Sequence, residues 1–430
     1  MTGKVGGLRT RMVIAFVLKG VAAVASFGLN WLIARHFGAH GVGQFALALT
    51  TTVITFTLAM AGLDTILVRT VAIERARNRP GVARSAVRKI VLHVLPVALV
   101  FGGLLFLGRD LVATYIAHEP TVAPMIGVMA FCVPILAMSK LASAGLRGVD
   151  RVGVSLAIDG PIGTSMAAVL LAAATFMGLA QSNLLPGILY SVCWAVAASL
   201  GWLVFMRDIR AWGPPQPFNE ALWPAGMPVV CSAVSLLFVD WFVMLQLSSE
   251  RTVAEAGLFR VAFQIVATLN LIIAASESIL SPVIAESFAR GDKYRISRIS
   301  RLTVVGMMAV GSPILLAVLF APHFLMGMFG PDFAEGATAL QILALGQAFN
   351  LLTGPAGSIL IMTKHERWLL AYAVISALLA AALALVLIPL YGVNGAAVAV
   401  SGSMIFRKAF AMGLVRWVVG IKIFERKPQT

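Results

Sequence analysis

Residues 90–108 of the 430-residue chain read IVLHVLPVALVFGGLLFLG, an apolar stretch whose only ionisable side chain is His93. A helix needs about 20 predominantly apolar residues to cross the hydrocarbon core of a bilayer. A cluster of basic side chains precedes the stretch, namely Arg75, Arg77, Arg79, Arg84, Arg88 and Lys89. The stretch therefore predicts a membrane-spanning helix with a strongly basic flank on one side.

Apolar stretches of similar length recur along the whole chain. Hydrophobic residues make up 60% of the sequence and charged residues 12%. Spanning segments must pair their backbone groups internally, so an all-α polytopic membrane protein is expected. We predict twelve spans at residues 12–34, 42–69, 90–108, 121–145, 152–180, 184–206, 222–247, 256–285, 302–322, 337–362, 368–390 and 393–417.

The distribution of basic residues predicts the orientation. Most of the 33 Lys and Arg residues follow an even number of spans, whereas the opposite loops hold Arg35, Arg109 and Arg251. The positive-inside rule then places both termini in the cytoplasm. The formal charge of +15 is therefore expected to lie mainly in cytoplasmic loops, beside anionic lipid headgroups. Because the membrane surface accounts for this charge, no nucleic-acid partner is expected.

The two halves of the chain repeat each other. The segment GQFALA at 43–48 matches GLFRVA at 257–262, and each opens a long span. Each half, 1–210 and 211–430, is predicted to contain six spans. Because six is an even number, the two halves enter the membrane in the same orientation. Parallel repeats are a transporter architecture with the binding site near the bilayer midplane. Within span 5, Asp159-Gly160-Pro161 predicts a break that is either a hinge or a static kink.

Ionisable residues inside spans are costly and face a cavity or a partner. On span 1, Lys19, Ser26 and Asn30 share one helical face, and on span 8 Arg260 and Gln264 share another with Thr268. The candidate substrate-binding residues are Lys19, Asn30, Arg260, Gln264, Arg407 and Lys408. They predict a polar cavity lined chiefly by spans 1, 2, 7 and 8.

Acidic residues inside spans have two interpretations. Asp64 ends a stripe with Thr50 and Thr57 on span 2, and Asp240 and Glu277 lie on spans 7 and 8. These three are either counter-ions to the cations or sites for a coupling ion, H+ or Na+. Lys140 lies near the cytoplasmic end of span 4 and is expected to extend to the membrane surface.

The cations inside the spans, Lys19, Arg260, Arg407 and Lys408, indicate a substrate that carries negative charge and a large polar portion. Arginine binds phosphate oxygens in a bidentate manner and lysine acts as a point charge, so phosphate joined to sugar fits this chemistry. The sequence contains no GxxxxGK[ST], HExxH or GxSxG motif. We expect neither an enzyme nor a metal or organic cofactor.

Several motifs resemble those of a known family. The segment ARHFGAHGVGQF at 34–45, Gly62-Leu63-Asp64, MFGPDF at 328–333 and YGVNGAA at 391–397 resemble polysaccharide-repeat flippases of the multidrug/oligosaccharidyl-lipid/polysaccharide exporter superfamily. The resemblance implies two six-helix bundles arranged as a V in the bacterial cytoplasmic membrane. It also implies alternating-access flipping of a polyprenyl-diphosphate-linked oligosaccharide to the outer leaflet for polysaccharide biosynthesis. Implied partners are membrane lipids, the lipid-linked glycan, a polysaccharide polymerase and other glycan-assembly proteins.

Two alternatives stay open. A cation-coupled multidrug exporter shares this fold, but it would favour carboxylates and aromatic residues over the cations in the spans. A membrane polysaccharide polymerase or glycosyltransferase would also be polytopic and basic. It would carry a long outer loop with catalytic residues, and the longest outer connection here, about 109–121, is short.

Overall fold

The computed structural model describes residues 2–179, 181–218, 223–363 and 367–420, and every regular element in these ranges is a helix. The chain forms two units, Met1–Trp241 and Phe242–Thr430. The division falls inside helix α10 (Trp223–Glu250), whereas the repeat in the sequence places it between residues 210 and 211. The last turns of α10 therefore belong to the second unit.

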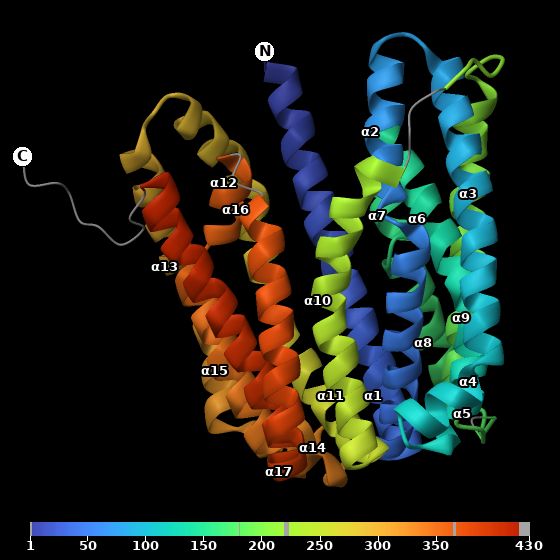
Figure 1. Ribbon diagram of the computed structural model, residues 1–430, viewed down its shortest axis with the longest axis vertical. Helices are drawn as coiled ribbons and strands as arrows, with labels where there is room; N and C mark the ends of the chain where they lie inside the picture. The colour runs from blue at the N-terminus through green and yellow to red at the C-terminus, as the bar shows by residue number, and fades with distance from the viewer. Residues whose placement is uncertain (1, 180, 219–222, 364–366, 421–430) are drawn as a thin grey trace, which may run out of the picture. The chain divides into compact units, whose positions relative to one another are not determined.

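The first unit is built from long apolar helices joined by short connections (Figure 1). Helix α1 packs against α8, α2 against α6 and α3, and α6 against α9. The bounds are α1 (Thr2–Met60), α2 (Leu63–Ala76), α3 (Pro80–Leu107), α5 (Ala123–Ala130), α6 (Cys132–Gly148), α7 (Val152–Ile158), α8 (Pro161–Phe176) and α9 (Leu185–Arg210). The short elements α4 (Arg109–Leu111), η1 (Val112–Ile116) and η2 (Pro120–Val122) lie between α3 and α5.

The second unit has the same character. Helix α15 packs against α17, α12 against α13 and α16, and α11 against α15. Its helices are α11 (Val253–Ala267), α12 (Asn270–Ala289), α13 (Lys293–Phe320), α14 (Pro322–Gly327), η3 (Pro331–Gly336), α15 (Ala337–Thr353), α16 (Ala356–Met362), α17 (Arg367–Leu414) and η4 (Val415–Val419). Side-chain caps start two of them: the Thr252 hydroxyl accepts from Glu255 N at 3.1 Å, and the Asp292 carboxylate accepts from Arg295 N at 2.8 Å.

Two long helices each join two predicted spans. Gly38 in α1 (φ 64°, ψ −170°) and Gly392 in α17 (φ 54°, ψ −128°) have non-helical backbone angles and separate two helices within each element. Both φ values are positive, a region that only glycine adopts readily. Spans 1 and 2 thus meet at Gly38, and spans 11 and 12 meet at Gly392.

Each of the twelve predicted spans overlaps a helix, although residues 180 and 222 at the ends of spans 5 and 7 lie outside the described residues. Eight ranges in the described part of the chain are long and apolar enough to cross a membrane, and these overlap ten of the predicted spans. The remaining two correspond to α10 and to α15 with α16. The prediction of an all-α polytopic membrane protein is therefore confirmed.

Several spans are broken, and the sequence predicts only some of the breaks. Span 2 is interrupted at Ala61 and Gly62, both with positive φ, and span 8 is interrupted at Thr268 and Leu269. Span 4 breaks at Phe131, as the proline inside this span predicts, because Pro134 cannot donate to the carbonyl of Ala130, four residues earlier. The break expected in span 5 is present, since α7 ends at Ile158 and α8 starts at Pro161.

Candidate functional site

A cavity of about 540 Å³ lies in the first unit where span 2 is broken. Helix α1 ends at Met60, and the left-handed Gly62 (φ 72°) is the N-cap residue of α2. Asp64 therefore lies in the first turn of α2. A carboxylate is favoured there by the partial positive charge of a helix N-terminus. Asp64 and Thr57 both line the cavity, whereas Thr50, one helical repeat earlier, is buried and donates to the carbonyl of Ala46 at 2.9 Å.

A close ion pair connects this cavity to the break in span 5. Lys140 Nζ lies 2.6 Å from Asp159 Oδ1, and the side chains are 36% and 20% exposed. Lys140 also lines the cavity. The expectation that Lys140 extends to the membrane surface is therefore wrong: Asp159, at the C-terminal cap of α7, holds it inside the unit.

Two aromatic residues of α9 form another wall of the cavity. The rings of Tyr190 and Trp194 lie 5.8 Å apart, and both side chains line the cavity. The buried Nε1–H of Trp194 has no hydrogen-bond partner among the described residues. A buried donor without a partner is costly, so this N–H is available to a ligand. Neither residue was predicted from the sequence, because aromatic side chains in an apolar span are equally typical of a packed core.

A second polar group lies in the second unit. Arg407 and Lys408 are half-buried on α17, inside the spanning range Ala371–Val419. Glu277 of α12 is close enough to interact electrostatically with Lys408, and Arg407 interacts with Tyr372. Tyr372 is buried in the core cluster that joins α12, α16 and α17. Arg407, Lys408 and Glu277, which the sequence predicts as separate site residues, thus lie together, and Tyr372 joins them.

Another polar network in the second unit was not predicted. Gln347 Nε2 donates to Asn270 Oδ1 at 2.6 Å, and Asn350 Nδ2 donates to Gln347 Oε1 at 3.3 Å. Gln347 and Asn350 are buried. Their spacing of three residues in an apolar span is the sequence signal that could have identified them.

The other selected residues are not part of either group. Lys19 is exposed on α1, and the buried Asn30 donates through Nδ2 to the carbonyl of Ser26 at 3.0 Å. Asp240 on α10, and Arg260 and Gln264 on α11, are half-buried and make interactions within the protein. Of the predicted site residues, Asp64 alone lines the cavity of the first unit.

No set of three or more His, Cys, Asp or Glu side chains in the described ranges could hold a metal ion. The cavity of the first unit has mostly apolar and aromatic walls with one carboxylate, Asp64, and one cation, Lys140. The group on α17 holds two cations, Arg407 and Lys408, and Glu277 of α12 interacts with Lys408.

Comparisons with known proteins agree with this arrangement. The family model described as polysaccharide biosynthesis protein matches residues 10–288, and the MatE model matches residues 226–386. No curated protein matches the sequence.

Solved structures share the fold at low sequence identity. A multidrug resistance MATE family transporter of the MOP superfamily, in an inward-facing conformation, has a TM-score of 0.76 and 13% identity over 94% of this chain and 98% of that chain. The lipid II flippase MurJ, in an inward closed conformation, has a TM-score of 0.70 and 12% identity over 94% of this chain and 87% of that chain. A MOP superfamily transporter from Pyrococcus furiosus, whose structure is described as having a binding pocket of reverse polarity, has a TM-score of 0.62 and 13% identity over 96% of this chain and 95% of that chain.

Proposed function

Because the chain belongs to the polysaccharide biosynthesis protein family, within the superfamily of multidrug, oligosaccharidyl-lipid and polysaccharide exporters, we propose that it flips a lipid-linked oligosaccharide. The substrate is a polyprenyl-diphosphate-linked glycan, and it moves from the cytoplasmic to the outer leaflet of the bacterial cytoplasmic membrane. Both termini lie in the cytoplasm, and transport proceeds by alternating access without ATP hydrolysis.

The observation that carries this proposal is the adjacent Arg407 and Lys408 inside a membrane span. Lys408 interacts with both Glu277 and Arg407, and Tyr372 interacts with Arg407 and Glu277, so these side chains form one group. Two cations beside a single carboxylate leave net positive charge in this group. That charge suits a diphosphate, which arginine and lysine bind through charge-assisted hydrogen bonds.

The remaining assignments extend this proposal. Lys19, Asn30, Arg260 and Gln264 complete the substrate-binding set. Asp64, Asp240 or Glu277 couples transport to H+ or Na+, because a carboxylate in a desolvated site can exchange a proton or hold a cation. A polysaccharide polymerase and other glycan-assembly proteins act on the product.

Complementation tests the proposal in cells. In a strain that lacks its flippase, Arg407→Gln and Lys408→Gln should abolish glycan export while the protein remains in the membrane. Each lost charge-assisted contact costs about 1.5–3 kcal/mol, which corresponds to roughly ten- to a hundred-fold weaker binding. Arg416→Gln is the matched control, because this exposed arginine lies in η4 at the end of the same helix. Normal export by both Gln variants would contradict the assignment.

A cation-coupled multidrug exporter is the second candidate. The cavity of the first unit favours it, because Asp64, Tyr190 and Trp194 together suit a flat organic cation. Efflux of a lipophilic fluorescent cation separates the two functions. If the protein is a drug exporter, Asp64→Asn should abolish efflux and Arg407→Gln should retain it. If it is a flippase, neither the wild type nor either variant should show efflux.

A further inference from the structure

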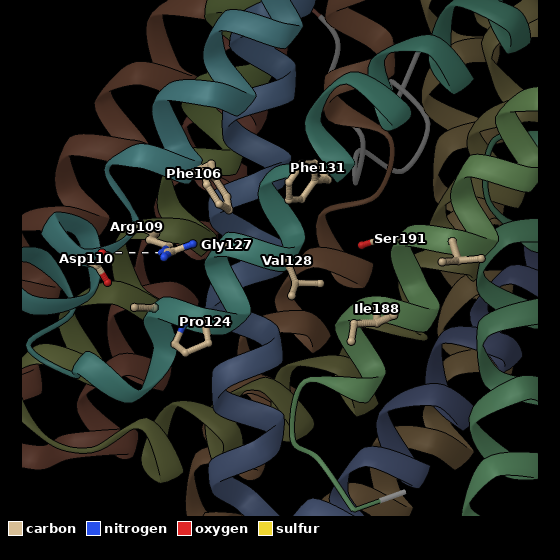
Figure 2. A pocket seen from close by; sticks show the side chains of 11 residues that line it. Phe106, Arg109, Asp110, Pro124, Gly127, Val128, Phe131, Ile188 and Ser191 are labelled. Atoms are coloured by element: carbon tan, nitrogen blue, oxygen red, sulfur yellow. Dashed lines mark ion pairs between the residues drawn. The ribbon is translucent and has the colours of Figure 1, made fainter. Parts of the chain in front are cut away.

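A second pocket in the first unit lies apart from the groups described above. It has a volume of about 400 Å³ and is lined by the end of α3, the short α4, α5 and α9 (Figure 2). Its walls are mostly apolar: Phe106 and Phe131 contact each other with ring centroids 5.4 Å apart, and Val128, Ile188 and Val192 complete the wall. The volume falls in the range of small-molecule sites.

Arg109 and Asp110 provide the charged end of this pocket. The guanidinium of Arg109 lies over the ring of Phe106, with Cζ 4.6 Å from the ring centroid. Its side chain passes Gly127, where an added Cβ would lie 3.0 Å from Arg109 Cδ and 3.2 Å from Nη1. Phe106 and the bare backbone of Gly127 therefore hold Arg109 against the pocket, as Figure 2 shows.

The charges of Arg109 and Asp110 remain accessible. Arg109 Nε lies 3.7 Å from Asp110 Oδ2, which is beyond hydrogen-bond distance, and the side chains are 37% and 73% exposed. An exposed pair of this kind contributes little to stability. The pocket thus presents a cation and an anion side by side, both free to bind an external group.

The pocket lies at the outer ends of the spans and opens toward lipid. Arg109 directly follows span 3, and Pro124 and Ile188 lie near the starts of spans 4 and 6, so these residues share one end of the spans. The basic loops occupy the other end, and the positive-inside rule makes this end the outer one. Phe131 is 60% exposed and Val192 52% exposed. Large apolar side chains exposed inside a spanning range face the hydrocarbon of the bilayer.

We propose that this pocket binds one phosphatidylethanolamine-type phospholipid of the outer leaflet. The phosphodiester accepts hydrogen bonds from Arg109, and the primary ammonium donates to Asp110. Part of an acyl chain fills the space between Phe131, Val128 and Ile188. The adjacent opposite charges match a zwitterionic headgroup better than an anionic one, because Asp110 would repel a second negative charge.

Native mass spectrometry of the full chain in detergent tests the proposal. Dioleoylphosphatidylethanolamine, dioleoylphosphatidylcholine and dioleoylphosphatidylglycerol are added in turn, and the bound fraction is measured. We expect the ethanolamine lipid to bind about tenfold more tightly than the other two, because only its headgroup offers a cationic N–H donor to Asp110. Choline has no N–H, and the glycerol hydroxyls are uncharged donors on an anionic lipid. Arg109→Gln should lower the affinity for all three lipids by about tenfold, and Asp110→Asn should remove the preference for ethanolamine.

Arg35→Gln is the matched control, since Arg35 is another outer-loop arginine that lies over an aromatic ring, Trp31, at 5.7 Å, and it does not line the pocket. This variant should bind like the wild type. Ile188→Trp and Val128→Trp fill the pocket by two independent substitutions, so that one poorly folded variant leaves the other as a test. Both should lose the ethanolamine lipid although Arg109 is intact.

Three results would overturn the proposal. Equal binding of the three lipids by the wild type would remove the headgroup match. Wild-type binding by both pocket-filling variants would show that the lipid contacts only the rim. Full competition by soluble phosphoethanolamine at the same concentration would show that the site takes the free headgroup compound and not a lipid.

Discussion

The ion pair between Lys140 and Asp159 should stabilise the first unit. Lys140→Met removes the cation from a carboxylate that is only 20% exposed at the break between α7 and α8. Removing one partner of a fully buried pair costs about 3–5 kcal/mol, whereas exposed pairs contribute about 0–1 kcal/mol. With exposures of 36% and 20%, we expect Lys140→Met to cost about 2 kcal/mol.

Thermal unfolding of the purified protein in detergent measures this effect. A loss of 2 kcal/mol corresponds to a decrease in Tm of roughly 4–8 °C for a unit of this size. The double variant Lys140→Met/Asp159→Asn should recover most of the loss, because no unpaired charge remains. Arg290→Met is the matched control: its pair with Glu286, also at 2.6 Å, leaves a carboxylate that is 47% exposed and should cost less. A change below about 0.5 kcal/mol for Lys140→Met, or equal Tm values for the single and double variants, would refute the reasoning.

Three further predictions follow from the packing and the cavity. In Gly145→Ala the new Cβ would overlap the ring of the buried Phe205, so thermal unfolding should show a loss of about 1–3 kcal/mol that the second change Phe205→Leu largely restores; no loss would contradict the packing. In Gly392→Ala the residue must keep φ 54° with its Cβ 2.5 Å from Glu255 Oε2, so unfolding should again show a loss of about 1–3 kcal/mol, and a stability equal to wild type would disprove the turn. If Asp64 exchanges protons, Asp64→Asn should lose transport driven by a pH gradient in proteoliposomes and still bind substrate; wild-type transport that ignores the gradient would exclude proton coupling.

Apolar length and basic loops were enough to predict the helical fold. Each of the twelve predicted spans overlaps a helix, because a spanning segment has no alternative way to pair its backbone. The breaks at Ala61–Gly62 and Thr268–Leu269 were not predictable in the same way. Hydropathy reports how apolar a segment is and does not report local backbone geometry. The left-handed Ala61 and Gly62, and the shift of Thr268 and Leu269 to hydrogen bonds three residues back, therefore leave it unchanged.

The candidate site was predicted in part. Charge inside a span identified Arg407, Lys408 and Glu277, and the structure brings these three together. Helical phase failed for Thr50, because phase assigns a face of one helix and cannot say which neighbouring helix covers it. The expectation for Lys140 came from its position near the end of span 4, which does not reveal that Asp159 on another helix pairs with it. Tyr190 was missed for the related reason that an aromatic residue looks the same in a core and in a cavity wall.

The most direct test of the proposed function is flipping by the purified protein in proteoliposomes. A polyprenyl-diphosphate-linked oligosaccharide is incorporated in both leaflets, and a glycan-cleaving enzyme added outside reports the fraction that is accessible. We predict that the wild-type protein makes nearly all of the lipid accessible, whereas Arg407→Gln and empty vesicles leave about half protected. If the wild-type protein leaves half of the lipid protected, while the same vesicles transport a lipophilic fluorescent cation, the chain is a drug exporter and the central claim is wrong.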